Sequence, residues 1–361
     1  MANENAFEEL KNYSKNFGHL LQGLKQEDGN LEEQYSEREV VFEKDKLKLF
    51  HYLNTNKDSS EDIGALKMPV LIVYALVNRP TILDLQRGHS AIAQMLASGL
   101  DVYLIDWGYP DKSDTSLDLS YYINEQINDC VEHICTESSF EKINLMGVCQ
   151  GGVFSLCYSS LFPERVKNLV TVVTPVDFQT SSDVLSNLVK HVDIDLMVNT
   201  MGNIPGDMLS NTFLSLRPYY LQVKKYLNLV EETDQLDEKN KERIAHFIMM
   251  ERWIFDSPDQ AGEAFREFVK GCYQQNLLMK DEFLVAGKTI NLSSLKMPVL
   301  NIYAEQDHLV PPDASKVLGK IISKNNYSEM QVKGGHIGIF VSPKSVKAIF
   351  PHIAKWLKTN K

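Results

Sequence analysis

Short apolar runs of strand length recur along the chain and alternate with helical segments, and this pattern limits the possible folds more than any other feature. Each run is apolar at successive residues rather than at every second one, as in strands buried on both faces of a parallel sheet. The sequence therefore predicts an α/β protein with a mostly parallel central sheet and helices on both faces. The runs lie at residues 69–76, 102–106, 143–148, 168–174, 298–304 and 327–332.

Three regions depart from this alternation and suggest how the chain is divided. Residues 39–53 alternate polar and apolar side chains like an antiparallel hairpin, so an α/β core is expected over 41–178 and 295–361. Between these parts the strand pattern stops, and 179–294 is expected to be an inserted, mainly helical cap over the carboxyl edge of the sheet.

Residues 1–40 are expected to form an N-terminal helical segment. Apolar side chains recur at helical spacing over residues 5–26, which predicts an amphipathic helix. This helix could pack on its own domain or bind a partner, and the sequence favours neither. The apolar positions are Phe7, Leu10, Tyr13, Phe17, Leu20, Leu21 and Leu24.

Charge and hydropathy exclude several classes of function. The formal net charge is −11, and without a basic stripe to neutralise phosphates a nucleic-acid partner is not expected. The first residues lack a basic and apolar signal segment, and the longest apolar run, at 70–77, is far too short to span a bilayer. We expect a cytoplasmic protein with no membrane span.

Cysteine and histidine spacing argues against disulfides and metal sites. The five cysteines form an odd number without a C-x-x-C pair, and the nine histidines lack zinc-site spacing. We expect free thiols and no metal.

The stretch LMGVCQGGVFSL, residues 145–156, has the pattern of a nucleophile turn between a buried strand and a helix. Gly147 and Gly151 lie two residues to either side of Cys149, as the G-x-nucleophile-x-G turn of the α/β-hydrolase fold requires. The helix N-terminus favours a thiolate at Cys149 and offers backbone donors to an oxyanion. The predicted donors are the N–H groups of Gln150 and, in the loop after the first core strand, Val77. The alternative is an inert buried cysteine in a tight turn.

A nucleophile of this fold needs an acid and a histidine later in the chain. Asp307 follows one late strand and His336 follows the next, so they are the predicted partners of Cys149. His308 is a candidate for lining the site, and Asp177 is a competing acid. Asp106 is expected to fix a loop or line the site.

These residues alone allow three functions. The elbow and the triad favour a cysteine-dependent hydrolase of the dienelactone hydrolase or thioesterase type. An acyltransferase and a non-enzymatic binding protein that keeps the elbow are the alternatives.

Several longer stretches resemble the polyhydroxyalkanoate synthases, specifically the short two-subunit kind (class III). The resemblance runs from about residue 40 to the C-terminus, and the family's G-x-C-x-G-G box is present without departure. It implies that the family's nucleophile, aspartate and histidine fall on Cys149, Asp307 and His336. The stretches are YALVNRPTILDLQ (74–86), residues 147–178, RWIFDSPDQAGEAFREF (252–268), QDHLVPPDAS (306–315) and GGHIGIFVSP (335–343).

The resemblance implies a polymerase of 3-hydroxyacyl-CoA, most directly 3-hydroxybutyryl-CoA, acting through a Cys149 thioester. Coenzyme A would be part of the substrate, and no cofactor would be needed. The resemblance further implies a homodimer, a complex with a second, non-catalytic subunit, and association with polyester storage granules.

Overall fold

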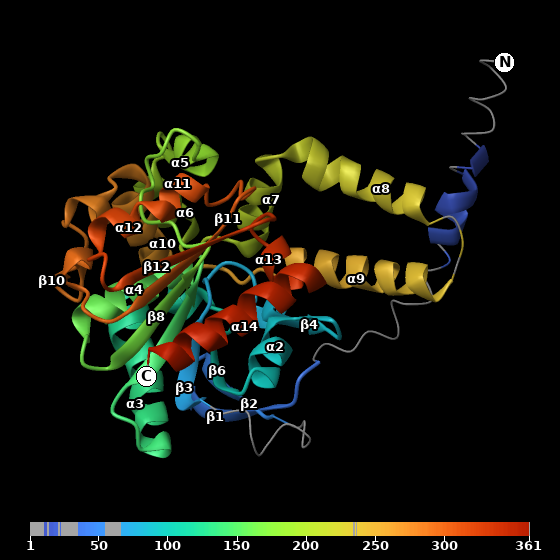
Figure 1. Ribbon diagram of the computed structural model, residues 1–361. Coiled ribbons are helices and arrows are strands. Elements are labelled where there is room, and N and C mark those ends of the chain that lie inside the picture. Colours follow the sequence, from blue (N-terminus) through green and yellow to red (C-terminus); the bar gives the residue numbers. More distant parts are fainter. Residues whose placement is uncertain are drawn as a thin grey trace. The chain divides into compact units, whose positions relative to one another are not determined.

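The computed structural model describes residues 11–12, 14–20, 22, 35–54, 66–233, 235 and 237–360. Their central feature is an eight-stranded sheet in the order β1-β2-β6-β3-β7-β8-β11-β12 (Figure 1). The pairs β1–β2 and β2–β6 are antiparallel, and the other neighbours are parallel. The predicted mostly parallel sheet is confirmed, and every predicted apolar run forms a strand. The strands are β1 (Arg38–Lys44), β2 (Leu47–Tyr52), β3 (Leu66–Val73), β6 (Leu100–Asp106), β7 (Ile143–Val148), β8 (Val166–Val172), β11 (Val299–Ala304) and β12 (Tyr327–Val332).

Helices cover both faces of this sheet. Leu71 and Val73 of β3 belong to one core cluster with Val131 of α3 and Val153 of α4. Val70 and Ile72, which alternate with them along β3, point to the opposite face and are also fully buried. There α2 packs on β6 and α14 on α2. This two-sided burial explains the continuous apolar runs in the sequence. The helices are α2 (Ala91–Ala97), α3 (Ile127–Ser138), α4 (Gln150–Leu161) and α14 (Pro343–Thr359).

The hairpin expected at 39–53 is confirmed as β1 and β2, joined by a turn in which Asp45 has φ 54°. Two further pairs of very short strands were not predicted, because two or three residues carry no periodic signal. One pair interrupts the region expected to be mainly helical. These strands are β4 (Asp84–Gln86), β5 (His89–Ser90), β9 (Leu284–Val285) and β10 (Lys288–Thr289).

The region 179–294 is otherwise built of helices, as expected. Helices occupy most of three segments in which apolar side chains recur at helical spacing, around residues 217–230, 241–255 and 260–279. The helices are α5 (Val184–Val189), α6 (Ile194–Met201), α7 (Gly206–Ser215), η5 (Tyr219–Lys224), α8 (Lys225–Glu232), α9 (Glu238–Phe255), α10 (Gly262–Phe268) and η6 (Val269–Gln274). Elsewhere lie η4 (Tyr121–Gln126), α11 (Pro312–Lys316), α12 (Leu318–Ile321) and α13 (Gly338–Val341).

The chain divides into two compact units. The larger unit comprises 34–206 and 258–361 and contains the whole sheet. The smaller unit comprises 1–33 and 207–257 and contains α8 and α9. The expected division into residues 1–40, the core and the cap at 179–294 stays a prediction.

The smaller unit has a small apolar core. Leu20 lies in a described helical stretch, 14–20, of the predicted N-terminal helix, and it packs with residues of α8 and α9. Phe17 on the same helix is 46% exposed. The other predicted apolar positions, Phe7, Leu10, Tyr13, Leu21 and Leu24, lie outside the described residues. None of the described helices has the length and apolar character to cross a membrane.

Candidate active site

Cys149 lies in the sharp turn between β7 and α4. Its backbone has φ 53° and ψ −122°, a conformation that L-residues seldom adopt and that is held by surrounding structure. Its N–H donates to the carbonyl of Val172 at 2.9 Å, which ties the turn to the end of β8. The thiol is partly exposed at the N-terminus of α4.

Three glycines permit this turn. A Cβ at Gly147 would lie 2.4 Å from the Cα of Gly152, and one at Gly151 would lie 2.2 Å from the carbonyl oxygen of Val73. A Cβ at Gly152 would lie 1.8 Å from the Thr174 hydroxyl. The strand–turn–helix context predicted from residues 145–156 is confirmed, and its glycines are required by close packing.

The loops after β11 and β12 bring Asp307 and His336 together. The two side chains are buried, and the Asp307 Oδ2 lies 2.7 Å from the His336 Nδ1. The other carboxylate oxygen accepts the N–H groups of Leu309 and Val310, both at 2.9 Å, which fixes its orientation. The two loops are also joined directly, because the Gln306 N–H donates to the Gly334 carbonyl.

His336 also contacts Cys149. Its burial disfavours the charged imidazolium, but the Asp307 carboxylate and the Cys149 sulfur, each of which also hydrogen-bonds to the ring, hold the pKa of His336 well above its usual value. The predicted nucleophile, base and acid therefore form one contiguous chain of side chains. It lies at the carboxyl ends of β7, β11 and β12, where ligands bind in open α/β sheets. Their catalytic roles stay a prediction.

The competing acid, Asp177, has other partners. Its carboxylate accepts hydrogen bonds from the Gln179 N–H at 3.0 Å and from the Asn276 amide at 2.9 Å. Asp177 thus ties the loop after β8 to the end of η6. Asp177 is a candidate acid by sequence because it follows a core strand, as Asp307 does.

The predicted oxyanion donors lie on neighbouring elements. Gln150 is the first residue of α4, and its side-chain oxygen accepts the Leu76 N–H at 3.0 Å. Val77 follows Leu76 in the chain and is half-buried. His308, the predicted lining residue, follows Asp307 and is half-buried as well.

The loop that carries Val77 is held by residues whose roles the sequence did not reveal. The Trp107 indole donates to the Tyr74 carbonyl at 3.0 Å, and Arg79 pairs with Asp106. Asp106 also accepts the Gly108 N–H at 3.0 Å, so it fixes loops, which is one of the two roles expected for it. The sequence does not indicate these roles of Arg79 and Trp107, because the partner of each side chain lies on or after a different strand.

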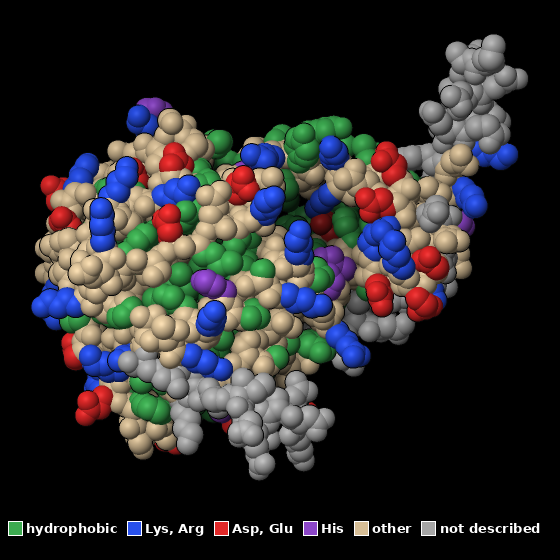
Figure 2. Space-filling view, viewed as in Figure 1, with side chains coloured by type: hydrophobic (Ala, Val, Ile, Leu, Met, Phe, Trp, Pro, Cys, Tyr) green, Lys and Arg blue, Asp and Glu red, His purple; other side chains and the backbone are tan. Residues whose placement is uncertain are grey.

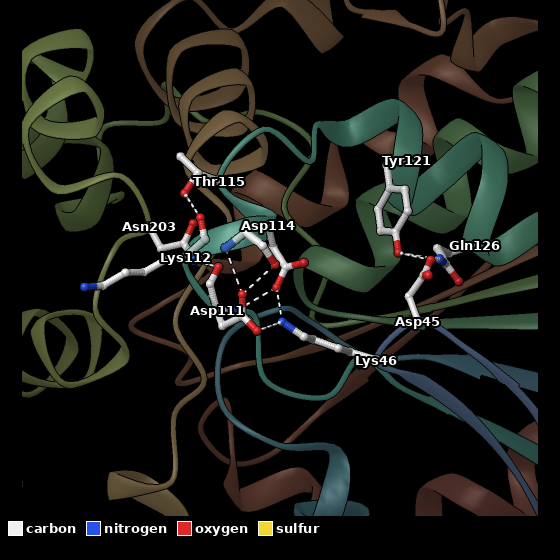
Figure 3. A network of polar contacts seen from close by, with 10 residues as sticks. Asp45, Lys46, Asp111, Lys112, Asp114, Thr115, Tyr121, Gln126 and Asn203 are labelled. Carbon is white, nitrogen blue, oxygen red and sulfur yellow. Dashed lines mark hydrogen bonds and ion pairs between the residues drawn. The ribbon is translucent and has the colours of Figure 1, made fainter.

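The loop after β6 is in turn held at its far end. Figure 3 shows Lys46, from the turn of the β1–β2 hairpin, between the carboxylates of Asp111 and Asp114. The Asn203 amide donates to the Asp111 carbonyl at 2.6 Å. This network fixes the loop that lies beside the Arg79–Asp106 pair.

Two tyrosines near the thiol were also missed. Burial raises the pKa of the Tyr74 and Tyr273 phenols, and the nearby Cys149 sulfur raises it further. Tyr74 lies within the apolar run at 69–76, which predicts only a strand, whereas Tyr273 lies in η6 within the expected cap. Only the folded chain brings both close to Cys149.

The remaining cysteines differ from Cys149 in their surroundings. Each of them is buried, and burial raises the pKa of its thiol, which makes the thiolate scarce. They are Cys130, Cys135, Cys157 and Cys272. Within the described part of the chain, no group of three or more His, Cys, Asp or Glu side chains could hold a metal ion.

A family comparison agrees with this fold. Residues 55–343 match the model of the alpha/beta hydrolase fold. Among solved structures, a monoacylglycerol lipase of Paleococcus ferrophilus aligns with a TM-score of 0.52 at 17% identity, over 81% of this chain and 95% of that one. A protein of Sulfolobus solfataricus aligns with a TM-score of 0.54 at 19% identity, over 91% and 100% of the two chains. At these identities the likeness shows the fold alone.

Closer relatives share the sequence over nearly its full length. A protein of Thiocystis violacea is 49% identical over 350 residues, which cover 97% of this chain and 96% of the relative. A protein of Allochromatium vinosum is 48% identical, again over 97% of this chain and 96% of the relative. A protein of a Synechocystis species is 47% identical over 93% of this chain and 88% of the relative. All three are named poly(3-hydroxyalkanoate) polymerase subunit PhaC.

Proposed function

Since the chain belongs to the poly(3-hydroxyalkanoate) polymerase family of α/β-hydrolase-fold acyltransferases, we propose that it polymerises 3-hydroxyacyl-CoA, most directly 3-hydroxybutyryl-CoA, into polyester with release of coenzyme A. The observation that carries the proposal is that His336 lies close to the Cys149 sulfur and has its Nδ1 atom 2.7 Å from the Asp307 carboxylate. Cys149, His336 and Asp307 act as nucleophile, base and acid.

In the first half of the cycle, His336 takes the thiol proton and the Cys149 sulfur attacks the thioester carbonyl. The negative oxygen that forms is stabilised by the N–H groups of Val77 and Gln150. The bond to coenzyme A then breaks, and the leaving thiolate takes the proton from His336. The acyl group is now a thioester of Cys149, and free coenzyme A leaves.

In the second half, a 3-hydroxyl oxygen attacks the Cys149 thioester and the His336–Asp307 pair takes the hydroxyl proton. An oxoester bond forms, the bond to Cys149 breaks, and the proton returns to the thiol. The polyester grows by one unit. No cofactor is required, because the substrate itself supplies the activated acyl group.

A thiol suits this chemistry better than a serine hydroxyl. Transfer of an acyl group from one thiol to another is nearly isoenergetic, so the Cys149 acyl group keeps its activation for attack by an alcohol. A serine would form an ordinary ester in the first step and lose that driving force. Cys149→Ser is therefore expected to polymerise very poorly.

The decisive experiment follows coenzyme A release and insoluble product together after 3-hydroxybutyryl-CoA is added. We expect both from the wild-type protein and neither from Cys149→Ala, while Cys272→Ala, the matched control at a buried thiol, stays active. Release of coenzyme A with soluble 3-hydroxybutyrate and no polymer would identify a hydrolase instead. Normal activity of Cys149→Ala would exclude the mechanism.

We further propose that the chain self-associates, joins a second, non-catalytic subunit, and stays with its product at polyester granules in the cytoplasm. The name "subunit" of its relatives supports a partner. An aromatic and aliphatic face on η5 and α8 supports self-association, since exposed apolar patches commonly mark interaction surfaces (Figure 2). We call it the η5–α8 face; its residues are Tyr219, Tyr220, Val223, Tyr226 and Leu227, each at least 36% exposed.

A further inference from the structure

The N-terminus of α4 is pressed against the end of β3. The space beside Gly151 is filled by backbone, because a Cβ there would lie 2.2 Å from the Val73 carbonyl oxygen and 2.6 Å from that of Tyr74. The turn that carries Cys149 and the loop that follows β3 are thus in direct contact. Any catalytic group on this loop has its position set relative to α4.

A buried hydrogen bond joins the two elements at this contact. The Gln150 side chain is only 6% exposed, and its Oε1 accepts the Leu76 N–H at 3.0 Å. The Leu76 N–H is shielded from water, so this amide oxygen replaces the solvent that the N–H would otherwise bind. The bond fixes the peptide that immediately precedes Val77.

Two further bonds to this loop act nearer its ends. Trp107 holds the Tyr74 carbonyl at the beginning, and Arg79 is held by Asp106 at the end. The Gln150 side chain alone among these three anchors acts between them, next to Val77. It is also the one anchor that belongs to a residue whose own N–H is a proposed oxyanion donor.

We propose that the Gln150 side chain is a positioning residue that sets the Val77 N–H at the correct distance from the Gln150 N–H, so that both donors meet the same oxyanion. This inference rests on the proposed function. An N–H at a helix start has no partner within the helix and is free to bind a ligand. One residue thereby supplies one donor through its backbone and places the second through its side chain.

The test compares two reactions of the same thiol in Gln150→Met, which keeps the side-chain length but loses the amide acceptor. Acylation of Cys149 by 3-hydroxybutyryl-CoA passes through an oxyanion, whereas alkylation by iodoacetamide does not. Loss of one oxyanion donor costs roughly 10²–10³-fold in rate, and a misplaced donor should cost less. We expect acylation, measured as coenzyme A released in a single turnover, to fall about 10–100-fold, with alkylation within about twofold of wild type.

Gln150→Glu provides a second, independent measurement. Its carboxylate oxygen can accept the Leu76 N–H, but the negative charge opposes the oxyanion. The ratio of its acylation rate to that of wild type should therefore rise as the pH falls and the carboxyl group is protonated. A side chain that lay away from the oxyanion would give a ratio that does not change with pH.

Ser155→Ala is the matched control. Ser155 is buried on the same helix and donates a 2.7 Å hydrogen bond, but to the Gly151 carbonyl of its own helix. Both reactions should stay within about twofold of wild type. An equal fall of acylation and alkylation in Gln150→Met, unchanged acylation in that variant, or a flat pH ratio for Gln150→Glu would overturn the inference. Failure of the proposed function looks different, because wild type would then release coenzyme A without forming polymer, or Cys149→Ala would release it as fast as wild type.

Discussion

At the scale of single residues, the surroundings of a side chain decide its chemistry more than its type does. Cys149 and Cys157 are eight residues apart, yet Cys149 is partly exposed beside His336, while Cys157 faces the core and burial raises the pKa of its thiol. The same contrast separates the two aspartates that follow core strands. Asp307 contacts the imidazole, and Asp177 binds an amide and a backbone N–H.

This contrast gives a prediction for the two acids. Asp307→Asn should lower the rate of polymer formation by roughly 10²–10⁴-fold, because the imidazole loses the carboxylate that orients it and stabilises its charged form. Asp177→Asn should leave most of the rate and cost about 1 kcal/mol of stability through its altered hydrogen bonds. Initial rates and urea unfolding of both variants check this. The opposite ranking of the two rates would move the acid to Asp177.

A second prediction concerns Asp183, which caps the N-terminus of α5 and is 2% exposed. Burial, with the nearby carboxylates of Asp313 and Asp177, raises its pKa to about 6 from an ordinary value of 3.8. The folded protein thus holds this proton more tightly than the unfolded chain. The contribution to stability is complete below pH 3.8 and is lost as the pH rises through about 6.

Asp183→Asn keeps an N-cap of similar quality without the buried charge. We expect it to be more stable than wild type above pH 6, by at most about 3 kcal/mol, and the gain to vanish near pH 4. The control is Asp193→Asn, which replaces the exposed cap of α6 and should show no such pH trend. Urea unfolding at several pH values measures the difference. A gain that is equal at pH 4 and pH 8 would contradict the assignment.

At the scale of elements, close packing of backbone on backbone shapes the site. The turn at Cys149 holds a strained conformation because β8 binds its N–H and because glycines let α4 approach β3 and the loop after β8. The hydrophobic core supplies the rigidity, since the strands on both sides are buried on both faces.

This packing predicts the effect of one added methyl group. Gly152→Ala should destabilise the fold by roughly 1–3 kcal/mol or more, because its Cβ would lie 1.8 Å from the Thr174 hydroxyl and 2.7 Å from the Thr174 Cβ. Gly338→Ala is the control: Gly338 begins a helix and has nothing within 4 Å of its Cβ position, so the variant should be neutral or slightly stabilising. Urea unfolding of both compares them. A Gly152→Ala variant as stable as wild type would show that the loop after β8 can shift to make room for the methyl group at little cost in stability.

At the scale of the whole molecule, the two units differ in what they bury. The larger unit holds an extensive core around its sheet, whereas the described core cluster of the smaller unit consists of five buried residues, with Phe247 partly buried against it. The smaller unit also carries the η5–α8 face. In Figure 2, Lys and Arg side chains are interspersed with Asp and Glu over the described part of the visible surface.

The η5–α8 face gives a prediction about assembly. Tyr220→Asp, at a side chain that is 58% exposed, should shift the protein towards the monomer in analytical ultracentrifugation, because a charge would be buried in the contact. Leu284→Asp, at a side chain that is 59% exposed in the larger unit, is the matched control and should sediment as wild type. Identical sedimentation of all three proteins would exclude the η5–α8 face as a self-association surface.

Much of this protein could be predicted from its sequence, because the relevant signals are local. Strands that are buried on both faces have continuous apolar runs, which can be recognised in the sequence. The turn at Cys149 requires glycines at fixed positions, and these can be recognised in one short stretch. Chain order further pointed to Asp307 and His336, since residues that follow parallel strands meet at one edge of the sheet.

Only the tertiary structure decided which of these groups touch. The choice of partner for His336 depends on two loops joined by the Gln306–Gly334 bond, and the Leu76–Gln150 bond joins residues 74 positions apart. Such contacts depend on strand order and on the distance between side chains in space, and neither leaves a periodic trace in the sequence. The sequence determined which residues are chemically able to act, and packing over long chain separations determined which of them lie within reach of the thiol.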